Sequence, residues 1–317
     1  IDLTGAEALS DLITAETEAQ QRFALANGTK AHRKLYDGWR RKLIKARAMI
    51  EAELDFADEG DVPNSLSDEV LDDVRELRAA VAAHASGYKN AEIIRDGFRV
   101  VILGAPNAGK SALLNALAKR DVAIVTDVPG TTRDLLEVNL DIGGIKVILV
   151  DTAGIRETEE RIEAIGIERS LQRAQEADLV LLVEDASMPL PFSGLPEKPV
   201  IRVGNKRDLL ADETLASYDC LVSAEHGDGL DGLLDLLQGA CEGYADRASD
   251  TLPFRARHVQ LLWDAVQSLD ASLAEQDDIE LRAEHLRVAS QSLGRIHGEI
   301  DVEDLLDTIF STFCIGK

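Results

Sequence analysis

A glycine-rich loop that ends in lysine and serine is the strongest chemical signal in this sequence. Residues 104–111 read Gly-Ala-Pro-Asn-Ala-Gly-Lys-Ser, after a run of valine, isoleucine and leucine and before an amphipathic run at 113–117. A phosphate-binding P-loop requires this context of a strand followed by a helix. Its glycines let backbone N–H groups surround phosphates, Lys110 neutralises the β and γ oxygens, and the Ser111 hydroxyl can bind Mg²⁺. The pattern favours a nucleoside triphosphate site over a glycine-rich turn with a surface lysine.

A second motif, Asp-Thr-Ala-Gly at 151–154, follows another buried apolar run. It matches D-x-x-G, in which the aspartate supports the metal through water and the glycine N–H contacts the γ-phosphate. Taken alone, a strand that ends in Asp and Gly is more often only a turn. Its value as a signal therefore depends on its position after the P-loop.

A third motif, Asn-Lys-Arg-Asp at 205–208, comes after a further apolar run, and Ser223 and Ala224 follow the last one. In N-K-x-D the Asp208 carboxylate accepts hydrogen bonds from two N–H groups on the edge of guanine, a donor pair that adenine lacks. The serine-alanine loop reads the guanine carbonyl through a backbone N–H. Motifs in this order at the ends of successive strands predict a GTP-binding domain.

Threonines and an asparagine predict how hydrolysis is arranged. Thr131 and Thr132 lie between the P-loop and the D-x-x-G motif, where a threonine hydroxyl closes the Mg²⁺ shell when the γ-phosphate is present. Alternatively, the two threonines belong only to a polar surface loop. A Ras-like GTPase carries a water-orienting glutamine after Gly154, but Ile155 stands here and cannot hydrogen-bond. Asn107 and the threonine pair are what potassium-activated GTPases show, in which K⁺ occupies the place of an arginine finger.

These motifs need a sheet that brings strand ends together, and the apolar pattern predicts one. Short runs rich in valine, isoleucine and leucine alternate with helical patterns, at 100–103, 147–150, 179–183, 200–203 and 221–222. Alternation of this kind predicts a mostly parallel sheet covered by helices. Gly143 and Gly144 form a two-residue hairpin turn in this reading, so one edge strand is expected to be antiparallel.

Helical spacing of apolar residues precedes and follows this α/β region. We therefore expect an α/β P-loop GTPase domain inserted into an all-α helical domain. The expected boundaries are 1–96 for the first helical part, 97–246 for the G domain and 247–317 for the second helical part.

The amino-acid composition of the chain excludes some kinds of site and partner. The formal net charge is −24, with 58 acidic and 34 basic residues, so most of the surface repels a phosphate backbone and any RNA contact must be local or partner-assisted. The three cysteines lack a C-x-x-C pair, which argues against a disulfide framework or a zinc site. With no bilayer-spanning apolar run and no signal peptide, a cytoplasmic protein is expected, with no membrane and no DNA among its partners.

The sequence resembles the MnmE/TrmE family of tRNA-modification GTPases. The resemblance lies in residues 104–111, 130–134 and 151–156, and above all in the terminal Phe-Cys-Ile-Gly-Lys at 313–317. It covers essentially the whole chain. It implies a homodimer whose G domains pair in the GTP state, a flavin-dependent partner subunit, and tRNA as the object of modification. The family's amino-terminal domain, which binds formyl-tetrahydrofolate, is expected to precede Ile1.

The resemblance also implies ligand sets. Mg²⁺ would be bound by Ser111 and Thr132, and K⁺ by the Asn107 side chain with the region of Thr126, Val128 and Thr131. The residues expected to contact GTP or GDP, its ions or the folate are Asn107, Ala108, Gly109, Lys110, Ser111, Ala112, Thr126, Asp127, Val128, Pro129, Gly130, Thr131, Thr132, Asp151, Thr152, Ala153, Gly154, Asn205, Lys206, Asp208, Ser223, Ala224 and Lys317.

The family's general base, a glutamate that acts through a bridging water, aligns with Glu163. Without the resemblance Glu163 is one glutamate in an acidic helical run, and a solvated position is the default for such a run. With Glu163 and Thr132, Arg156 completes the expected catalytic set by steadying the switch, although it also fits a plain surface arginine. Cys314 and Lys317 are implied to reach the modification centre, where Lys317 helps to hold the folate; a near-terminal cysteine is otherwise an inert small hydrophobe.

A basic run stands out against the acidic chain. Lysines and arginines are frequent between residues 30 and 47, with Tyr36 and Trp39 among them. This run fits a contact with tRNA and equally a solvated helix face with its two aromatics turned inward.

Together with the motifs, the resemblance implies a potassium-activated GTPase that drives conformational changes in the modification of the tRNA wobble uridine, of the 5-carboxymethylaminomethyl type. The alternative is a ribosome-assembly GTPase of the same K⁺-dependent class. Proteins of that class usually append a basic RNA-binding domain, whereas both flanks here are helical and the chain is acidic. A scaffold that binds GTP without turnover is a third reading, and it requires the catalytic residues to be idle.

Overall fold

The computed structural model describes residues 2–28, 30–55, 65–124, 137–151, 173–190, 192, 194–210, 217–275 and 278–298. The described residues group into two compact units. The helical unit comprises those within Ile1–Ala15, Gln21–Arg95 and Ala248–Lys317, and the α/β unit those within Glu16–Gln20 and Asp96–Arg247. Among the described helices, none combines the length and the apolar character that crossing a bilayer requires.

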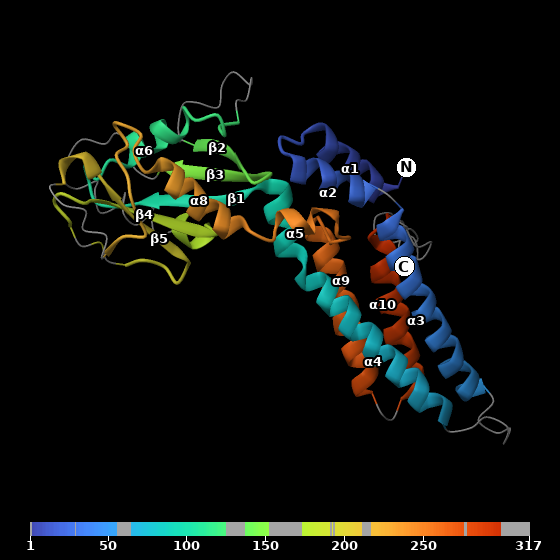
Figure 1. The fold of residues 1–317 in the computed structure, drawn as a ribbon. Helices are drawn as coiled ribbons and strands as arrows, with labels where there is room; N and C mark the ends of the chain where they lie inside the picture. Colours follow the sequence, from blue (N-terminus) through green and yellow to red (C-terminus); the bar gives the residue numbers. More distant parts are fainter. Residues whose placement is uncertain are drawn as a thin grey trace, which may run out of the picture. The chain divides into compact units, whose positions relative to one another are not determined.

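The α/β unit is built on a six-stranded sheet with the spatial order β2-β3-β1-β4-β5-β6 (Figure 1). Its strands are β1 (Phe98–Leu103), β2 (Glu137–Ile142), β3 (Ile145–Asp151), β4 (Leu179–Asp185), β5 (Val200–Asn205) and β6 (Cys220–Leu221). Its other elements are α6 (Lys110–Leu117), η1 (Arg207–Leu209), α8 (Leu230–Cys241) and the part of η3 (Ala245–Ser249) up to Arg247. All neighbouring strands pair in parallel except β2 and β3. The expected mostly parallel sheet with one antiparallel edge strand is confirmed.

Central strands of the sheet are covered on both faces. Every residue of β4 before Asp185 is buried, and β1 exposes only Arg99. Continuous apolar runs of this kind suit a parallel sheet with helices on both sides, because neither face meets water. The helices α6 and α8 pack against β3 and β2.

The hairpin between β2 and β3 turns at Gly143 and Gly144, whose φ angles are +60° and +83°. Two successive residues with positive φ match the twist of the flanking strands, and glycine adopts them without a Cβ clash. Asp141 accepts a hydrogen bond from the N–H of Gly144 at 2.9 Å and fixes the turn. The two-residue turn expected from the sequence is present.

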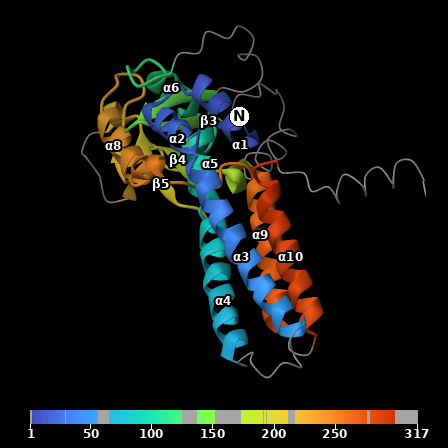
Figure 2. The ribbon, with the colours of Figure 1, turned by 90° about the vertical axis from the view of Figure 1, so that its right-hand side faces the viewer.

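The helical unit contains α1 (Leu3–Ile13), the part of α2 (Glu18–Gly28) from Gln21 onward, α3 (Ala31–Asp55), α4 (Ser65–Ser86), α5 (Tyr88–Asp96) up to Arg95, α9 (Ala256–Ala274) and α10 (Ile279–Arg295). The long helices α3, α4, α9 and α10 lie side by side as a bundle (Figures 1 and 2). Asp2 and Asp278 cap α1 and α10 by accepting hydrogen bonds from backbone N–H groups in the first turn. Segments far apart in the sequence therefore form one bundle, since α3 and α4 precede the sheet and α9 and α10 follow it.

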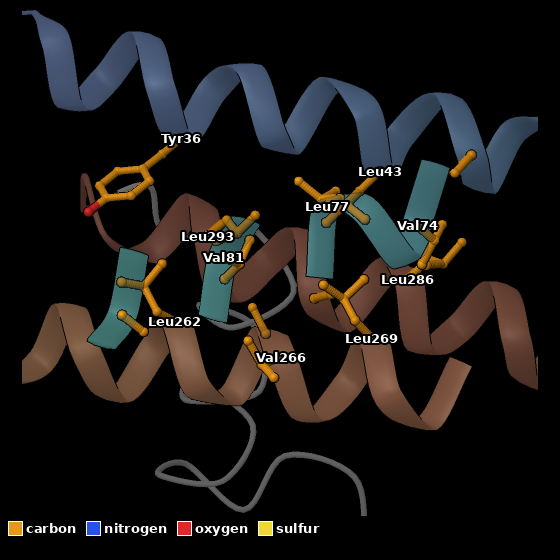
Figure 3. Packing of buried hydrophobic residues seen from close by; sticks show 14 of the residues in the cluster. Tyr36, Leu43, Val74, Leu77, Val81, Leu262, Val266, Leu269, Leu286 and Leu293 are labelled. Atoms are coloured by element: carbon orange, nitrogen blue, oxygen red, sulfur yellow. The ribbon is translucent and has the colours of Figure 1, made fainter. Parts of the chain in front are cut away.

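The core of the bundle is a continuous set of aliphatic side chains with one tyrosine (Figure 3). Tyr36 and Leu43 point from α3 toward α9 and α10, and each is 1% exposed. The other labelled members are Val74, Leu77 and Val81 of α4, Leu262, Val266 and Leu269 of α9, and Leu286 and Leu293 of α10. Removing such side chains from water is the main stabilisation of the bundle.

Four of the six histidines of the chain meet beside Tyr36: His32, His84, His258 and His297. The Tyr36 hydroxyl is 2.9 Å from His84 Nε2, and Nε2 of the buried His258 is 3.3 Å from Glu7 Oε2. Burial and the neighbouring histidines lower the pKa of His32 to about 3 and that of His84 to about 4. The imidazoles of His32 and His84 are therefore neutral in the folded protein at neutral pH.

This cluster predicts a loss of stability in mild acid. Unfolded histidine titrates near pH ~6.5, so the stabilisation is complete above that value and is lost as the pH falls toward the lower folded pKa values. The expected loss at pH ~5 is roughly 2 kcal/mol for each of His32 and His84. Burial alone would raise the pKa of Glu7, but hydrogen bonds from His258 and Arg257 hold it at about 2, so this carboxylate stays ionised over the same range.

Urea unfolding followed by tryptophan fluorescence measures this loss, because both tryptophans, Trp39 and Trp263, lie in the helical unit. The midpoint should fall between pH ~7 and ~5. The H32Q/H84Q variant should show a smaller fall, whereas H226Q, at a solvent-exposed histidine of the other unit, should behave like the parent. Equal pH dependence in all three proteins would contradict this assignment.

Candidate nucleotide-binding site

The predicted motifs meet at one edge of the sheet. The strands β1, β3, β4, β5 and β6 are parallel, so their carboxyl ends lie at the same edge. The chain runs from β1 through β2 to β3 on one side of β1 and then crosses from β3 to β4 on the other side, which makes the end of β1 a switch point of the topology. Ligands of open α/β sheets bind at such a point. The loop at 104–109 starts here.

Backbone conformation gives the loop its shape. Gly104 has φ +152°, and a Cβ atom on it would lie 2.0 Å from the Val183 carbonyl oxygen. Gly109 has φ +91°, and a Cβ there would lie 2.1 Å from Asn205 Nδ2. Asn107 adopts φ +61°, a left-handed conformation that is uncommon for a residue with a side chain. The two glycines are thus required by close contacts to β4 and to the N-K-x-D motif.

Lys110 and Ser111 begin α6 directly after the loop. Lys110 Nζ donates to the carbonyl oxygens of Gly104 and Ala105 at 2.8 and 2.9 Å, so the ammonium group lies inside the curve of the loop. Burial lowers the pKa of Lys110, and the charge of Asp151 opposes this shift. The Ser111 hydroxyl donates to Asp151 Oδ2 at 2.5 Å. The Ser111 hydroxyl and the Asp151 carboxylate therefore lie next to each other beside the loop. Mg²⁺ prefers oxygen ligands of this kind.

Asn205 connects two of the motifs. It is 2% exposed, its Nδ2 donates to the Ala108 carbonyl at 2.9 Å, and its Oδ1 accepts from the Ala224 N–H at 3.1 Å. One buried amide thus uses both of its polar atoms to hold the phosphate loop and the serine-alanine loop at fixed positions. A buried amide with its donors and acceptor satisfied makes the geometry specific.

Asp208 and Ser223 lie within hydrogen-bond distance of each other. A hydrogen bond with Ser223 lowers the pKa of Asp208, with smaller contributions from a backbone N–H and from the neighbouring His226 and Lys206. His226 Nδ1 is 3.9 Å from Asp208 Oδ1 and 3.1 Å from Ser223 Oγ. The Asp208 carboxylate is ionised at neutral pH and can accept hydrogen bonds from N–H donors of a base.

Asp185 belongs to this arrangement, and motif reasoning did not identify it. It ends β4 opposite Asn205 in the parallel register, and its Oδ2 is 2.6 Å from Lys206 Nζ. Lys206 has φ +63°, and Asp185 Oδ1 accepts from the N–H and hydroxyl of Ser187 at 3.0 and 2.6 Å. Burial alone would raise the pKa of Asp185, but these hydrogen bonds lower it. The sequence feature that could have identified Asp185 is its position as a carboxylate at the end of β4, the strand beside β5.

The Asp185–Lys206 pair predicts a weaker nucleotide site when it is broken. D185N removes the charge that holds the Lys206 ammonium, so we expect about a tenfold loss in GTP and GDP affinity. K206M should give a similar loss, and the double variant should be little weaker than either single variant, because both remove one interaction. Titration with a fluorescent GDP analogue measures all three. Losses that simply add in the double variant would contradict the coupling.

The structure therefore brings together the described members of the expected set, namely Asn107, Ala108, Gly109, Lys110, Ser111, Ala112, Asp151, Asn205, Lys206, Asp208, Ser223 and Ala224. The remaining members lie outside the described residues: Thr126, Asp127, Val128, Pro129, Gly130, Thr131, Thr132, Thr152, Ala153, Gly154, Arg156, Glu163, Cys314 and Lys317.

Known tRNA modification GTPases match this chain over its full length. The model of the MnmE helical domain matches residues 3–314. A tRNA modification GTPase MnmE of Chelativorans sp. (strain BNC1) is 64% identical over 318 residues, covering 100% of this chain and 72% of the relative. The corresponding protein of Mesorhizobium japonicum is 56% identical over 323 residues, covering 100% of this chain and 73% of the relative. Among solved structures, the G domain of the T. maritima FeoB iron transporter has 25% sequence identity and a TM-score of 0.34, covering 46% of this chain and 99% of that one.

Proposed function

Because this chain belongs to the MnmE family of tRNA modification GTPases, we propose that it is a potassium-activated GTP hydrolase whose cycle drives modification of the tRNA wobble uridine. It is a GTPase of the tRNA modification class. We further propose K⁺ as the activating ion, pairing of the G domains, a 5-carboxymethylaminomethyl modification and a flavin-dependent partner subunit.

The observation that carries the proposal is the double hydrogen bond of Asn205. This residue ties the phosphate loop at Ala108 to the guanine-reading loop at Ala224. A nucleotide that spans these two loops meets backbone N–H groups at its phosphates and the Asp208 carboxylate at its base. These two hydrogen bonds hold the two recognition points at a set distance from each other, and preorganisation of this kind favours binding.

Phosphate binding follows from the geometry of the loop. The backbone N–H groups of 107–112 and the start of α6 favour negative charge. Lys110 lies inside the loop and can exchange its bonds to the carbonyls of Gly104 and Ala105 for the β and γ oxygens. Ser111, with Asp151 beside it, would hold Mg²⁺, and Thr132 would complete its shell when the γ-phosphate is present. The metal supplies charge neutralisation at the phosphates.

Hydrolysis depends on residues that we assign from family membership. Asn107, in its left-handed conformation at the loop, would hold K⁺ together with Thr126, Val128 and Thr131. Positive charge between the β and γ phosphates lowers the barrier, as an arginine finger does. Glu163 would orient the attacking water through a second water, since Ile155 cannot do so. Arg156 would steady the switch segment.

The proposed assembly is a homodimer whose G domains pair across the nucleotide. We assign 97–246 to the G domain, and 1–96 with 247–317 to the helical domain. A flavin-dependent subunit is the proposed partner in adding a 5-carboxymethylaminomethyl group to tRNA in the cytoplasm. Lys317 and Cys314 would act at the modification centre with formyl-tetrahydrofolate. Family membership favours this function over ribosome assembly.

Hydrolysis of GTP compared with ATP tests the enzymatic assignment. The purified chain with Mg²⁺ should release phosphate from GTP and should be saturated by it, whereas ATP should support at least ~100-fold lower kcat/KM, because adenine leaves the Asp208 carboxylate without its two donors. Removal of Mg²⁺ with a chelator should abolish the GTP reaction. Equal use of both nucleotides would overturn the guanine site.

A further inference from the structure

The outward face of α3 has the opposite charge to the rest of the protein. Eight of the 34 lysines and arginines lie within residues 30–47, and Asp37 is the only carboxylate among them. The chain as a whole carries 58 acidic residues. A face that served only solubility would share the mixed, mostly acidic character of the remaining surface.

The basic side chains form a stripe along the helix. Lys30, which precedes the first turn, and Lys34, Arg41 and Lys45 are all exposed and follow one another at helical spacing. With a rise of 1.5 Å per residue they span roughly 22 Å. A groove of about 520 Å³ follows the same face, lined among the described residues by side chains from Lys30 to Ile44. The stripe is a positively charged surface; we call it the α3 basic face.

The apolar side of α3 packs into the core of the bundle. Tyr36 and Leu43 point away from the α3 basic face and are buried against α9 and α10 (Figure 3). Trp39 packs against the same core. Both aromatics thus turn toward the core, as the alternative of a solvated helix face described, and the α3 basic face has no apolar strip of its own apart from the exposed Ile44. Insertion into a lipid surface needs such a strip, so the face suits a polyanion in solution better than a membrane.

The basic residues of α3 lie at positions where their charges destabilise the helix. The first turn of α3 contains no acidic residue, although the positive end of a helix dipole favours carboxylates and disfavours cations. Lys30 with Lys34, and Arg41 with Lys45, are like-charge pairs four residues apart, which are unfavourable. Arg33 pairs with Asp37 at 3.5 Å, but within the described part of the chain no carboxylate pairs with Lys30, Lys34 or Lys45. Locally unfavourable choices of this kind concentrate at functional surfaces.

We propose that the α3 basic face binds the phosphate backbone of tRNA. The ammonium and guanidinium groups of Lys34, Arg41 and Lys45 contact phosphates, and the N–H groups at the start of α3 add a further attraction for an anion. Contacts to phosphates position an RNA without reading its sequence. Because the remaining surface is acidic and repels RNA, this face also determines how the RNA is oriented. The inference rests on the proposed function, which makes tRNA the object of modification.

The test compares two triple variants that remove the same charge. K34Q/R41Q/K45Q changes the α3 basic face, and R75Q/K89Q/K119Q changes exposed positions elsewhere. Binding of an unmodified, fluorescently labelled tRNA transcript is measured between about 50 and 200 mM salt. The first variant should lose at least ~10-fold in affinity and make the plot of log affinity against log salt shallower by about 2 to 3. The control should lose no more than ~2-fold.

Other outcomes overturn the inference in distinguishable ways. Equal tRNA binding by both variants would remove the role of the α3 basic face and leave the proposed function intact. Absence of tRNA binding by the parent chain, with normal GTP hydrolysis, would contradict both the surface and the proposed role of tRNA. Selective loss of binding to phosphatidylserine vesicles, with tRNA binding unchanged, would assign the face to a lipid surface instead. GTP hydrolysis without RNA should be the same in both variants and serves as the folding control.

Discussion

Replacement of Asp208 by asparagine is expected to turn the guanine site into one that prefers xanthine nucleotides. The carboxylate accepts from the N1–H and the amino group of guanine, whereas an asparagine amide offers a donor that matches the carbonyl at the corresponding position of xanthine. GTP affinity should fall roughly 100-fold or more, because charge-assisted hydrogen bonds are replaced by an unpaired donor. Titrations with GTP and with xanthosine triphosphate measure both affinities.

The structure supports the assumption that Asp208 is ionised, since the hydrogen bond with Ser223 lowers its pKa. D246N makes the same charge change at an exposed position of η3 and should leave both affinities unchanged. If D208N bound GTP within a few-fold (~3-fold) of the parent, the carboxylate would not read the base, because loss of a charged partner costs more than this.

Replacement of Glu163 by alanine is expected to abolish GTP hydrolysis and to spare nucleotide binding. A positioned general base contributes about 10²- to 10⁴-fold to a rate, and Ile155 offers no alternative group for orienting water. The measurement is single-turnover hydrolysis together with the affinity for a fluorescent GTP analogue. Glu159 and Glu168 lie in the same acidic run, so E159A and E168A are matched controls that should retain the parental rate. Unchanged turnover in E163A would remove the assigned role.

The sequence was sufficient to locate the phosphate loop and the hairpin, because both depend on short-range chemistry. Gly104 and Gly109 are needed where the backbone approaches Val183 and Asn205, and Gly143 and Gly144 are needed for positive φ. A strand before the loop and a helix after it follow from apolar patterns of a few residues. The same holds for the antiparallel edge strand, which the hairpin turn requires.

Contacts between neighbouring strands could not be obtained in this way. The pair of Asp185 and Lys206 depends on the parallel register of β4 and β5, and the two hydrogen bonds of Asn205 depend on loops that follow β1 and β6. The last strand is Cys220–Leu221, one residue earlier than the apolar pattern at 221–222 indicated. Val222 still donates its N–H to the Gly204 carbonyl at 2.8 Å, but the chain then turns into the loop of Ser223.

The histidine cluster shows the same limit in the helical unit. His32, His84, His258 and His297 are spread over most of the sequence, and nothing in their local context marks them as neighbours. They meet only because the helices before and after the sheet form one bundle. Burial lowers the pKa of His32, His84 and His258, and a local sequence pattern does not report burial.

Steady-state GTP hydrolysis in KCl and in NaCl at equal ionic strength tests the central claim most directly. A K⁺ ion at Asn107 would supply the charge that an arginine finger supplies elsewhere, and such a charge is worth about 10³- to 10⁵-fold in favourable cases. The account predicts strong stimulation by K⁺ and slow turnover in Na⁺, with the stimulation lost in N107A. Equal, slow rates in both salts would contradict it and would indicate a GTPase that a partner activates.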